Sequence, residues 1–303
     1  MTAPQFRVGL GLGLGETWRT AEEFTDIVRT AEVSGWDSLW FSEHLTGGTP
    51  AQIPQLAFAA AVTSRIRIGT SITVVPGRSP VDLARNLSTL NLLAEGRLLP
   101  IFGLGIAEPD EHSAFNVKPE QRGRWLDESL PVLRRLTDGD SVTHHSDLFE
   151  LDDISLRSDR IRPITSFWMG GRSRTELRRA GRLADGWLAS FSTPEETAAG
   201  IREVKNAAQA AGRSVDEDHY GLLFPYARHA HKPAVREILA RAHPGVDHST
   251  LAPVGPRQLA DTLRRHARGG VSKFVLVPSE ETDEWATEVL LCREDVDVAL
   301  ASI

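Results

Sequence analysis

The chain has 303 residues, of which 41% are hydrophobic and 25% are charged, a balance typical of a globular protein with a large core. Its formal net charge of -7 argues against a general nucleic-acid binder, and no stretch approaches the roughly 18 apolar residues that cross a membrane. A single cysteine, Cys292, excludes an internal disulfide, and the N-terminus has no basic segment followed by an apolar one, so we expect a cytoplasmic protein without a signal peptide.

The first half of the chain alternates between strand and helix patterns. The glycine-rich strand predicted from Phe6 to Leu14 misses the register of a dinucleotide-binding fingerprint, because Leu14 and Glu16 stand where a third glycine is needed. Further strands are predicted at Ser38–Phe41, Ile66–Val75 and Leu98–Leu104, and helices at Thr20–Ser34, Pro54–Thr63, Pro80–Leu93 and Gln121–Leu136. The segment from Gly105 to Glu120 is predicted as a loop.

The second half adds a small hairpin and then resumes the alternation. Val142–Leu151 has a hairpin pattern, and a polar loop is predicted from Asp152 to Pro163. Phe167 to Trp187 is predicted as strand, glycine turn, helix and the start of a strand. The remaining strands are predicted at Tyr220–Pro225 and Lys273–Pro278, and the remaining helices at Pro194–Ala211, Lys232–Ala242, Gln258–Ala267 and Asp283–Leu300.

This pattern predicts one α/β domain over residues 1–303. Strands that alternate with helices form a parallel sheet, and about eight such units in a chain of this length fit a closed (β/α)8 TIM barrel with inserted loops. An open doubly wound sheet is the alternative, and the missing dinucleotide fingerprint counts against its commonest form.

Polar residues follow several predicted strands, where TIM barrels carry their active sites. Glu43 and His44 follow the second strand, Thr70, Ser71 and Ile72 lie in the third, and Gly105 ends the fourth. An imidazole is easily poised to pass a proton near neutral pH, so His44 is a candidate catalytic residue. Glu43 either orients His44 or bonds a ring edge; the alternative is a solvated loop charge.

A glycine turn follows the fifth predicted strand, at Gly170, Gly171, Arg172 and Ser173. Glycines let a backbone approach an anion, and the free N–H groups of a helix start point at it. Ser173 is a plausible N-cap with Glu176 as its capping-box partner, and Arg172 could clamp a phosphate. The alternative is a tight strand–helix turn without a ligand.

The other histidines and arginines give weaker signals. His144, His145, His229 and His231 lack carboxylate or cysteine partners in the sequence nearby, so we expect no metal site. The arginines of the helix after Ser173 are predicted to form a solvated face. They are Arg174, Arg178, Arg179 and Arg182.

The ordered set of motifs resembles the bacterial-luciferase-like superfamily of TIM-barrel flavin and deazaflavin enzymes. The matching segments lie between about residues 6 and 190. They are residues 35–44 (GWDSLWFSEH), 65–71 (RIRIGTS), 102–105 (FGLG), 121–124 (QRGR) with Asp127 and Glu128, and Gly170–Gly171 through residues 183–187 (LADGW).

The resemblance implies a cofactor at the barrel mouth, either FMN or the 5-deazaflavin coenzyme F-420. It implies that Gly170, Gly171, Arg172 and Ser173 hold the cofactor phosphate. A non-proline cis peptide is implied at about Ser71–Ile72, under the central ring. Glu43 and His44 match an acidic-His pair that faces the cofactor in the deazaflavin branch, although Asp is commoner where this chain has Glu43. The loop from Ile106 to Glu111 lacks the basic set that holds a substrate phosphate in the sugar-phosphate dehydrogenases.

The favoured hypothesis is therefore an F-420-dependent oxidoreductase that moves a hydride to or from a small organic substrate. The alternatives are an FMN-dependent monooxygenase and a barrel that binds a ligand without a cofactor. We expect a small-molecule substrate, a homodimer, and neither nucleic-acid nor membrane partners.

Overall fold

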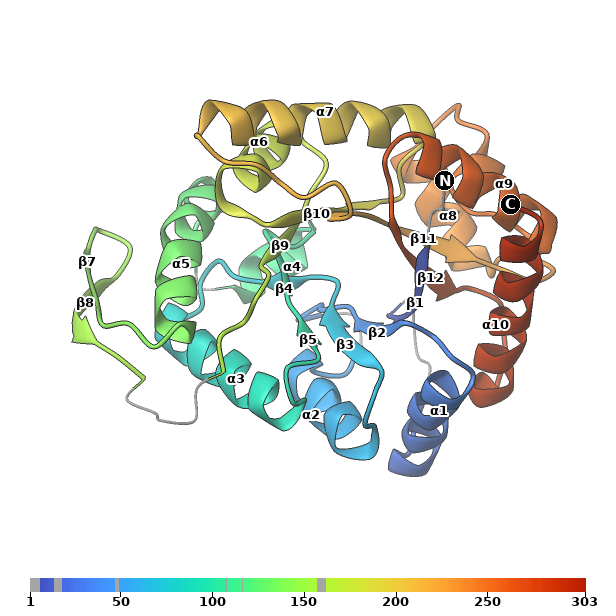
Figure 1. The fold of residues 1–303 in the computed structure, drawn as a ribbon, viewed down its shortest axis with the longest axis horizontal. Helices are drawn as coiled ribbons and strands as arrows, with labels where there is room; N and C mark the ends of the chain where they lie inside the picture. The colour runs from blue at the N-terminus through green and yellow to red at the C-terminus, as the bar shows by residue number, and fades with distance from the viewer. Residues whose placement is uncertain (1–5, 14–17, 47–48, 107, 116, 157–161) are drawn as a thin grey trace.

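A ten-stranded, curled sheet with helices packed around it forms the centre of the protein (Figure 1). The computed structural model describes residues 6–13, 18–46, 49–106, 108–115, 117–156 and 162–303. The strands of this sheet are β1 (Arg7–Leu12), β2 (Ser38–Phe41), β3 (Arg67–Thr70), β4 (Thr73–Val74), β5 (Leu98–Leu99), β6 (Ile101–Gly103), β9 (Trp168–Gly170), β10 (Gly186–Ser190), β11 (Tyr220–Tyr226) and β12 (Lys273–Pro278).

Helices follow most of the strands, as the alternation predicts. They are α1 (Ala21–Val33), α2 (Gln52–Val62), α3 (Pro80–Leu93), α4 (Pro109–Ala114), α5 (Arg122–Thr137), α6 (Arg174–Leu183), α7 (Pro194–Ala210), α8 (Pro233–Ala242), α9 (Gly255–Arg268) and α10 (Trp285–Ala301), with short 3-10 turns η1 (Pro119–Gln121) and η2 (His248–Thr250). In the described part of the chain, none of the helices is both long and apolar enough to span a bilayer.

Every recorded pairing in the large sheet is parallel, in the order β4-β6-β9-β10-β11-β12-β1-β2-β3-β5. Two of the predicted strands are each split in two. The Ile66–Val75 strand breaks at Ser71–Ile72, where the predicted non-proline cis peptide is confirmed. The Leu98–Leu104 strand breaks at Pro100, which has no N–H to donate to a ladder.

Continuous apolar runs explain why this sheet is covered on both faces. All residues of β11 and β12 are buried, as expected of parallel strands between a filled interior and an outer layer of helices. Each helix turns one apolar face inward: in α1, Phe24, Ile27 and Val28 are at most 2% exposed. Burial of such a side chain contributes about 1.5–3 kcal/mol, so the covering helices supply much of the stability.

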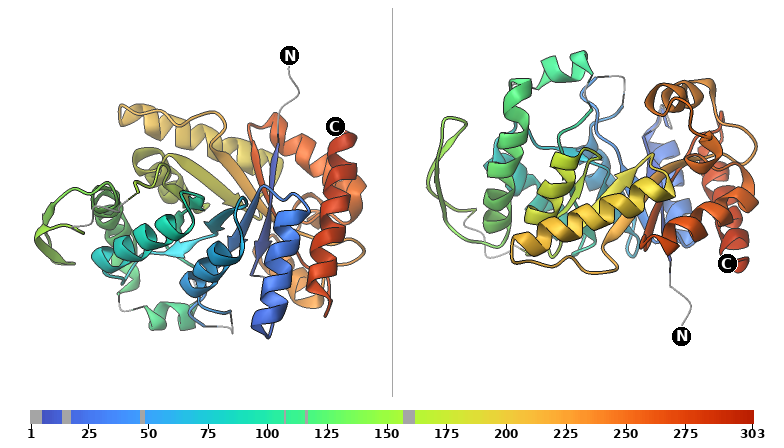
Figure 2. Two further views of the ribbon diagram at one scale, coloured as in Figure 1. Left: turned by 60° about the horizontal axis from the view of Figure 1, so that its bottom comes forward. Right: turned by 90° about the horizontal axis from the view of Figure 1, so that it is seen from above.

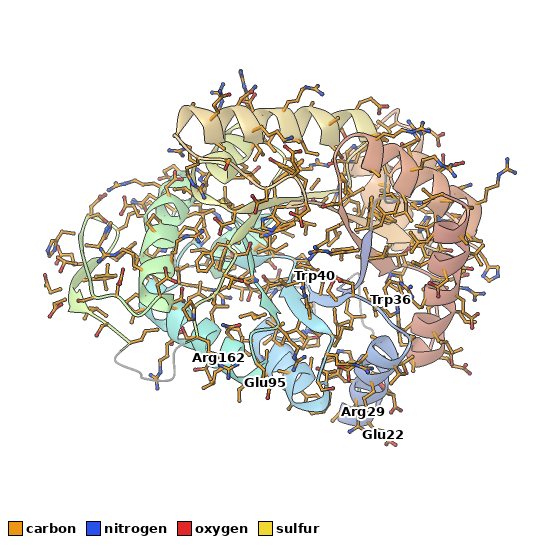
Figure 3. All side chains as sticks on the ribbon, viewed as in Figure 1. Glu22, Arg29, Trp36, Trp40, Glu95 and Arg162 are labelled. Atoms are coloured by element: carbon orange, nitrogen blue, oxygen red, sulfur yellow. The ribbon has the colours of Figure 1, made fainter. Side chains whose placement is uncertain are left out.

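Two tryptophans fill the inside of the curled sheet, and Figure 3 labels one of them, Trp40, toward its centre. Glycines make room for them: a Cβ at Gly69 would lie 2.4 Å from the Trp40 ring, and a Cβ at Gly186 would lie 2.3 Å from the Trp168 ring. The buried Lys273 ammonium lies 5.7 and 5.6 Å from these two rings. Trp168 and Lys273 begin β9 and β12, so side chains fill the interior at the amino ends of these strands.

Three sequence predictions need correction. The predicted loop from Gly105 to Glu120 contains helix α4 and turn η1. The hairpin extends further than predicted, because β7 (Val142–His145) pairs with β8 (Glu150–Ile154); it projects beyond α5 (Figure 1). Arg179 is not on a solvated face: it is 5% exposed and donates to Asp127 of α5 at 2.8 Å.

Candidate active site

The candidate residues from the sequence follow strands whose carboxyl ends share one edge of the sheet. Contacts join several of them: a Cβ at Gly170 would lie 2.8 Å from Ile72, and a Cβ at Gly105 would lie 3.1 Å from Val74, two residues after Ile72. The right view of Figure 2 shows α4 and α8 at the same end of the molecule. Strand ends and two connecting helices therefore meet around one region.

Glu43 is a buried anchor. Its side chain is 7% exposed, and its two oxygens accept from the Val74 backbone N–H at 2.7 Å and from Arg78 at 2.7 Å. Burial raises the pKa of this carboxyl, against the opposing effects of Arg78 and the Val74 N–H. One oxygen joins the end of β2 to β4 and the other pairs with Arg78 in the segment after β4, which gives Glu43 a structural role in this arrangement.

His44 lies half-buried in the turn after β2. Glu111 of α4 holds the same turn: its carboxylate accepts from the Leu45 N–H at 3.2 Å and from the Thr46 N–H at 2.8 Å, and the imidazole charge contributes to lowering the pKa of that carboxyl. This carboxylate comes from more than 60 residues further along the chain. An imidazole in a fixed turn can serve as an acid or base.

The third predicted strand carries one hydroxyl that is hydrogen-bonded within the protein and one that is not. Thr70 is fully buried, and its hydroxyl both donates to the Ile101 carbonyl at 2.9 Å and accepts from the Ile101 N–H at 2.7 Å, so it joins β3 to β6. The Ser71 hydroxyl is also buried, but it has no hydrogen-bond partner among the described residues. Buried polar groups are rarely left unpaired, so Ser71 fits a ligand with a heteroatom.

Gln52 holds the backbone around this strand, and the sequence interpretation missed it. It is 1% exposed, and its amide donates to the Phe41 carbonyl at 2.7 Å and to the Ile72 carbonyl at 3.2 Å. The Thr73 hydroxyl donates to the amide oxygen at 2.8 Å. Its burial at the start of α2 was not visible from the sequence pattern, which placed the helix start two residues later, at Pro54.

The glycine turn after β9 has the predicted capping box. Ser173 is the N-cap, its hydroxyl accepts from the Glu176 N–H, and Glu176 accepts from the Ser173 N–H at 2.9 Å and from the Arg172 N–H at 3.2 Å. Gly171 has φ +128, and a Cβ there would lie 2.7 Å from the Cβ of Glu176. The turn therefore binds a carboxylate of its own chain with N–H groups that were predicted to bind phosphate.

The Arg172 side chain is held by α8 and the end of β10. Its guanidinium donates to His243 Nε2 at 2.7 Å and to the Phe191 carbonyl at 3.3 Å. Because arginine can only donate, this imidazole nitrogen must accept, so His243 is neutral here. Burial, and then the Arg172 charge, lower the pKa of His243.

Arg122 is a second cation at this edge, and the sequence interpretation gave it no role. It is 4% exposed and donates to the Leu104 carbonyl, next to Gly105. Its guanidinium lies 5.1 Å from the centre of the Phe115 ring, and Nη1 has no hydrogen-bond partner within the described part of the chain. Burial lowers its pKa, and Glu111 opposes that shift.

The four histidines that the sequence analysis set aside each have a polar partner. His144 Nε2 lies 3.0 Å from Glu128, His145 Nε2 lies 3.2 Å from Asp152, and His229 Nδ1 lies 3.0 Å from Glu280. His231 Nδ1 lies 2.7 Å from the Ser279 hydroxyl. Among the residues that the structure describes, only Asp216, Asp218 and His219 bring three potential metal-ligand atoms together, at the amino end of β11.

A parallel sheet with its polar residues at the carboxyl edge defines an α/β protein of the type that binds ligands at that edge. A family model described as luciferase-like monooxygenase matches residues 3–278, and the chain belongs to this family. The resemblance inferred from the sequence motifs is thereby confirmed.

Two curated relatives are named for deazaflavin or methanopterin chemistry. The F-420-dependent glucose-6-phosphate dehydrogenase of Nakamurella multipartita is 28% identical over 229 residues, which cover 72% of this chain and 66% of that protein. The 5,10-methylenetetrahydromethanopterin reductase of Methanopyrus kandleri is 26% identical over 205 residues, which cover 63% of this chain and 58% of the relative. The chain thus spans about three fifths of the length of these relatives.

Solved structures share the fold over nearly the whole chain. An F-420-dependent secondary alcohol dehydrogenase in complex with an F-420–acetone adduct has a TM-score of 0.79 at 20% identity, covering 97% of this chain and 99% of that one. The oxygenating constituent of 3,6-diketocamphane monooxygenase from Pseudomonas putida, in complex with FMN, has a TM-score of 0.76 at 17% identity, covering 97% and 98%. At these identities the likeness extends to the fold alone.

Proposed function

We propose that this protein is an oxidoreductase that uses coenzyme F-420 to move a hydride to or from a small organic substrate. The observation that carries the proposal is the buried Ser71 hydroxyl, which has no partner among the described residues and lies at the cis peptide expected under the cofactor ring. The relative from Nakamurella multipartita, whose name includes this coenzyme, supports the choice of cofactor.

We infer that the curled sheet closes into the (β/α)8 barrel expected from the sequence. The two ends of the strand order are β4 and β5. β4 follows β3 after two residues, and β5 precedes β6 after one, while β3 pairs with β5 and β4 pairs with β6. Each split strand therefore contributes to both ends of the sheet, which is what closure requires.

The chain's own residues fit a flat ring with a phosphate tail. Ser71 and Ile72 would lie under the ring, with Gly105 nearby. The first-turn N–H groups of α6 and the turn from Gly170 to Ser173 would hold the phosphate, in competition with the Glu176 carboxylate. When bound, the deazaflavin supplies or accepts the hydride.

His44 is the proposed proton donor or acceptor for the substrate. It is half-buried in a turn that the Glu111 carboxylate holds through the Leu45 and Thr46 N–H groups, and imidazole is the side chain that most often serves as a general acid or base. We assign Glu43 and Thr70 to support of the site, because their polar atoms are engaged by Val74, Arg78 and Ile101. Of the two predicted catalytic residues, Glu43 and His44, only His44 therefore keeps a proposed catalytic role.

An FMN-dependent monooxygenase is the second candidate, favoured by the FMN complex among the structural neighbours. The two candidates differ in the ring that the site prefers and in the use of oxygen. A fluorescence titration with both cofactors separates them: tighter binding of coenzyme F-420 than of FMN is expected. The reverse order of affinity would overturn the deazaflavin proposal.

His44→Ala tests the catalytic assignment. We expect turnover to fall by about 10²–10⁴-fold, the usual contribution of a positioned acid or base, while cofactor affinity stays within about twofold. His145→Ala is the matched control, because that imidazole is 58% exposed on the hairpin and pairs only with Asp152 among the described residues. A large loss of cofactor binding in His44→Ala would make His44 a ligand-binding residue instead.

A further inference from the structure

Glu111 is a buried carboxylate in a short helix that the sequence did not predict. Only 2% of the residue is exposed, although α4 connects β6 to α5 across the carboxyl edge of the sheet. Burial of a carboxylate is costly unless hydrogen bonds stabilise the charged form. The partners of Glu111 therefore show what α4 is fixed to.

All of its recorded hydrogen bonds reach the two residues after His44. Glu111 accepts from the Leu45 N–H at 3.2 Å, from the Thr46 N–H at 2.8 Å and from the Thr46 hydroxyl at 2.9 Å. These residues follow the end of β2, where no neighbouring strand satisfies their N–H groups. The carboxylate thus replaces a strand partner and fixes the backbone immediately after His44.

The opposite end of α4 is fixed to the sheet as well. Phe115, which follows the helix, lies under the Arg122 guanidinium at 5.1 Å, and Arg122 donates to the Leu104 carbonyl at the end of β6. Helix α4 therefore forms a bridge from the end of β6 to the turn after β2.

The Glu111 charge interacts with the His44 imidazole and with the Arg122 guanidinium. Glu43 precedes His44 in the chain but is paired with Arg78. Three hydrogen bonds hold the pKa of Glu111 below its usual range in spite of burial, so the carboxylate is ionised at neutral pH.

We propose that Glu111 is a positioning residue for His44: its hydrogen bonds to Leu45 and Thr46 fix the turn that carries the imidazole. The proposal rests on the proposed role of His44 in the oxidoreductase. It makes α4 part of the catalytic arrangement, and it predicts that changes in this helix alter proton transfer without changing the cofactor phosphate site.

The first test needs no cofactor. The His44 imidazole is observed by NMR, with its signal assigned by its loss in His44→Ala, and amide exchange is measured for Leu45 and Thr46. In Glu111→Gln we expect the imidazole signal to shift, because the turn that carries it is released, and exchange at both amides to accelerate at least tenfold. An unchanged imidazole signal together with unchanged exchange would overturn the proposal.

Glu111→Asp separates position from charge, and it serves if Glu111→Gln folds poorly. It keeps the charge but shortens the side chain by one methylene, so exchange at the Leu45 and Thr46 amides should still accelerate and the imidazole signal should still shift. Glu108→Gln is the matched control, because Glu108 precedes the same helix, is 49% exposed and pairs with Arg241 at the surface. This control should match the wild type in both measurements.

The second test uses turnover with coenzyme F-420. Glu111→Gln should lower kcat at least tenfold and leave cofactor affinity within about twofold. If Glu111→Gln behaved as Glu108→Gln does, Glu111 would have no positioning role. Absence of turnover in the wild-type protein with any cofactor would refute the proposed function instead, and the NMR measurements would still decide the role of Glu111.

Discussion

Gly171→Ala is the substitution that most directly probes the turn proposed to hold the cofactor phosphate. The backbone of Gly171 has φ +128, which L-residues rarely adopt, and a Cβ built there would lie 2.7 Å from the Cβ and 2.8 Å from the Cδ of Glu176. The new methyl group would therefore meet the capping carboxylate of α6 and not an empty space. Glu176 and the Arg172 and Ser173 N–H groups that it binds would have to shift.

Two effects add in this variant. The unfavourable backbone conformation costs about 1–2 kcal/mol, and forcing a methyl group into a filled space costs about 1–3 kcal/mol. We therefore expect a loss of about 3 kcal/mol in the free energy of unfolding, measured by urea denaturation. Gly139→Ala isolates the first effect, because Gly139 has φ +93 and nothing within 4 Å of a built Cβ.

The same pair of variants tests the cofactor site. Displacing the N–H groups of the turn should weaken cofactor binding at least tenfold in Gly171→Ala, or about 1.4 kcal/mol, and Gly139→Ala should bind as the wild type does. Equal stability and equal affinity in the two variants would refute the reasoning, because the contact with Glu176 would then carry no energetic consequence.

Three further outcomes follow from buried groups. Burial lowers the pKa of Lys273 from 10.5 to about 8, so between these pH values the unfolded chain binds a proton that the folded protein does not. The free energy of unfolding should therefore rise with pH over this range, by at most about 3 kcal/mol. Urea denaturation at pH 7.5 and pH 10 measures this rise, which Lys273→Met should abolish. Burial raises the pKa of the Cys292 thiol, which donates to Glu288, so iodoacetamide should modify it at least 100-fold more slowly in the native than in the denatured protein, as followed by mass spectrometry. Gly69→Ala should cost about 1–3 kcal/mol by crowding Trp40, and a denaturation midpoint equal to that of the wild type would contradict the packing of that ring.

The order of strands and helices was predictable because it depends on local periodicity. The spacing of Phe24, Ile27 and Val28 is enough to place them on one helix face. Long apolar runs likewise predict strands that are buried on both faces of the sheet. Helix α4 was missed because its sequence, PDEHSA, has no apolar stripe. Its place is fixed by Glu111, whose partners lie about 65 residues away in the chain.

The candidate site was predictable where it depends on strand ends and not where it depends on side-chain direction. His44, Ser71 and the turn at Gly171 follow from the rule that parallel strands deliver polar residues to one edge. The direction of the Arg172 guanidinium does not follow from it, because His243 and the Phe191 carbonyl, which hold that group, lie 71 and 19 residues away.

Two contacts that sequence reasoning did not predict share a physical origin. Glu111 comes from α4, and His243 follows α8; both segments connect strands to later helices, and both reach residues near strand ends. The strands fix where the candidate site lies, but these connections fix the turn after His44 and the guanidinium of Arg172. Since loops and connections change more easily than a packed sheet, substrate preference in this protein should depend mainly on α4 and on the segment around α8.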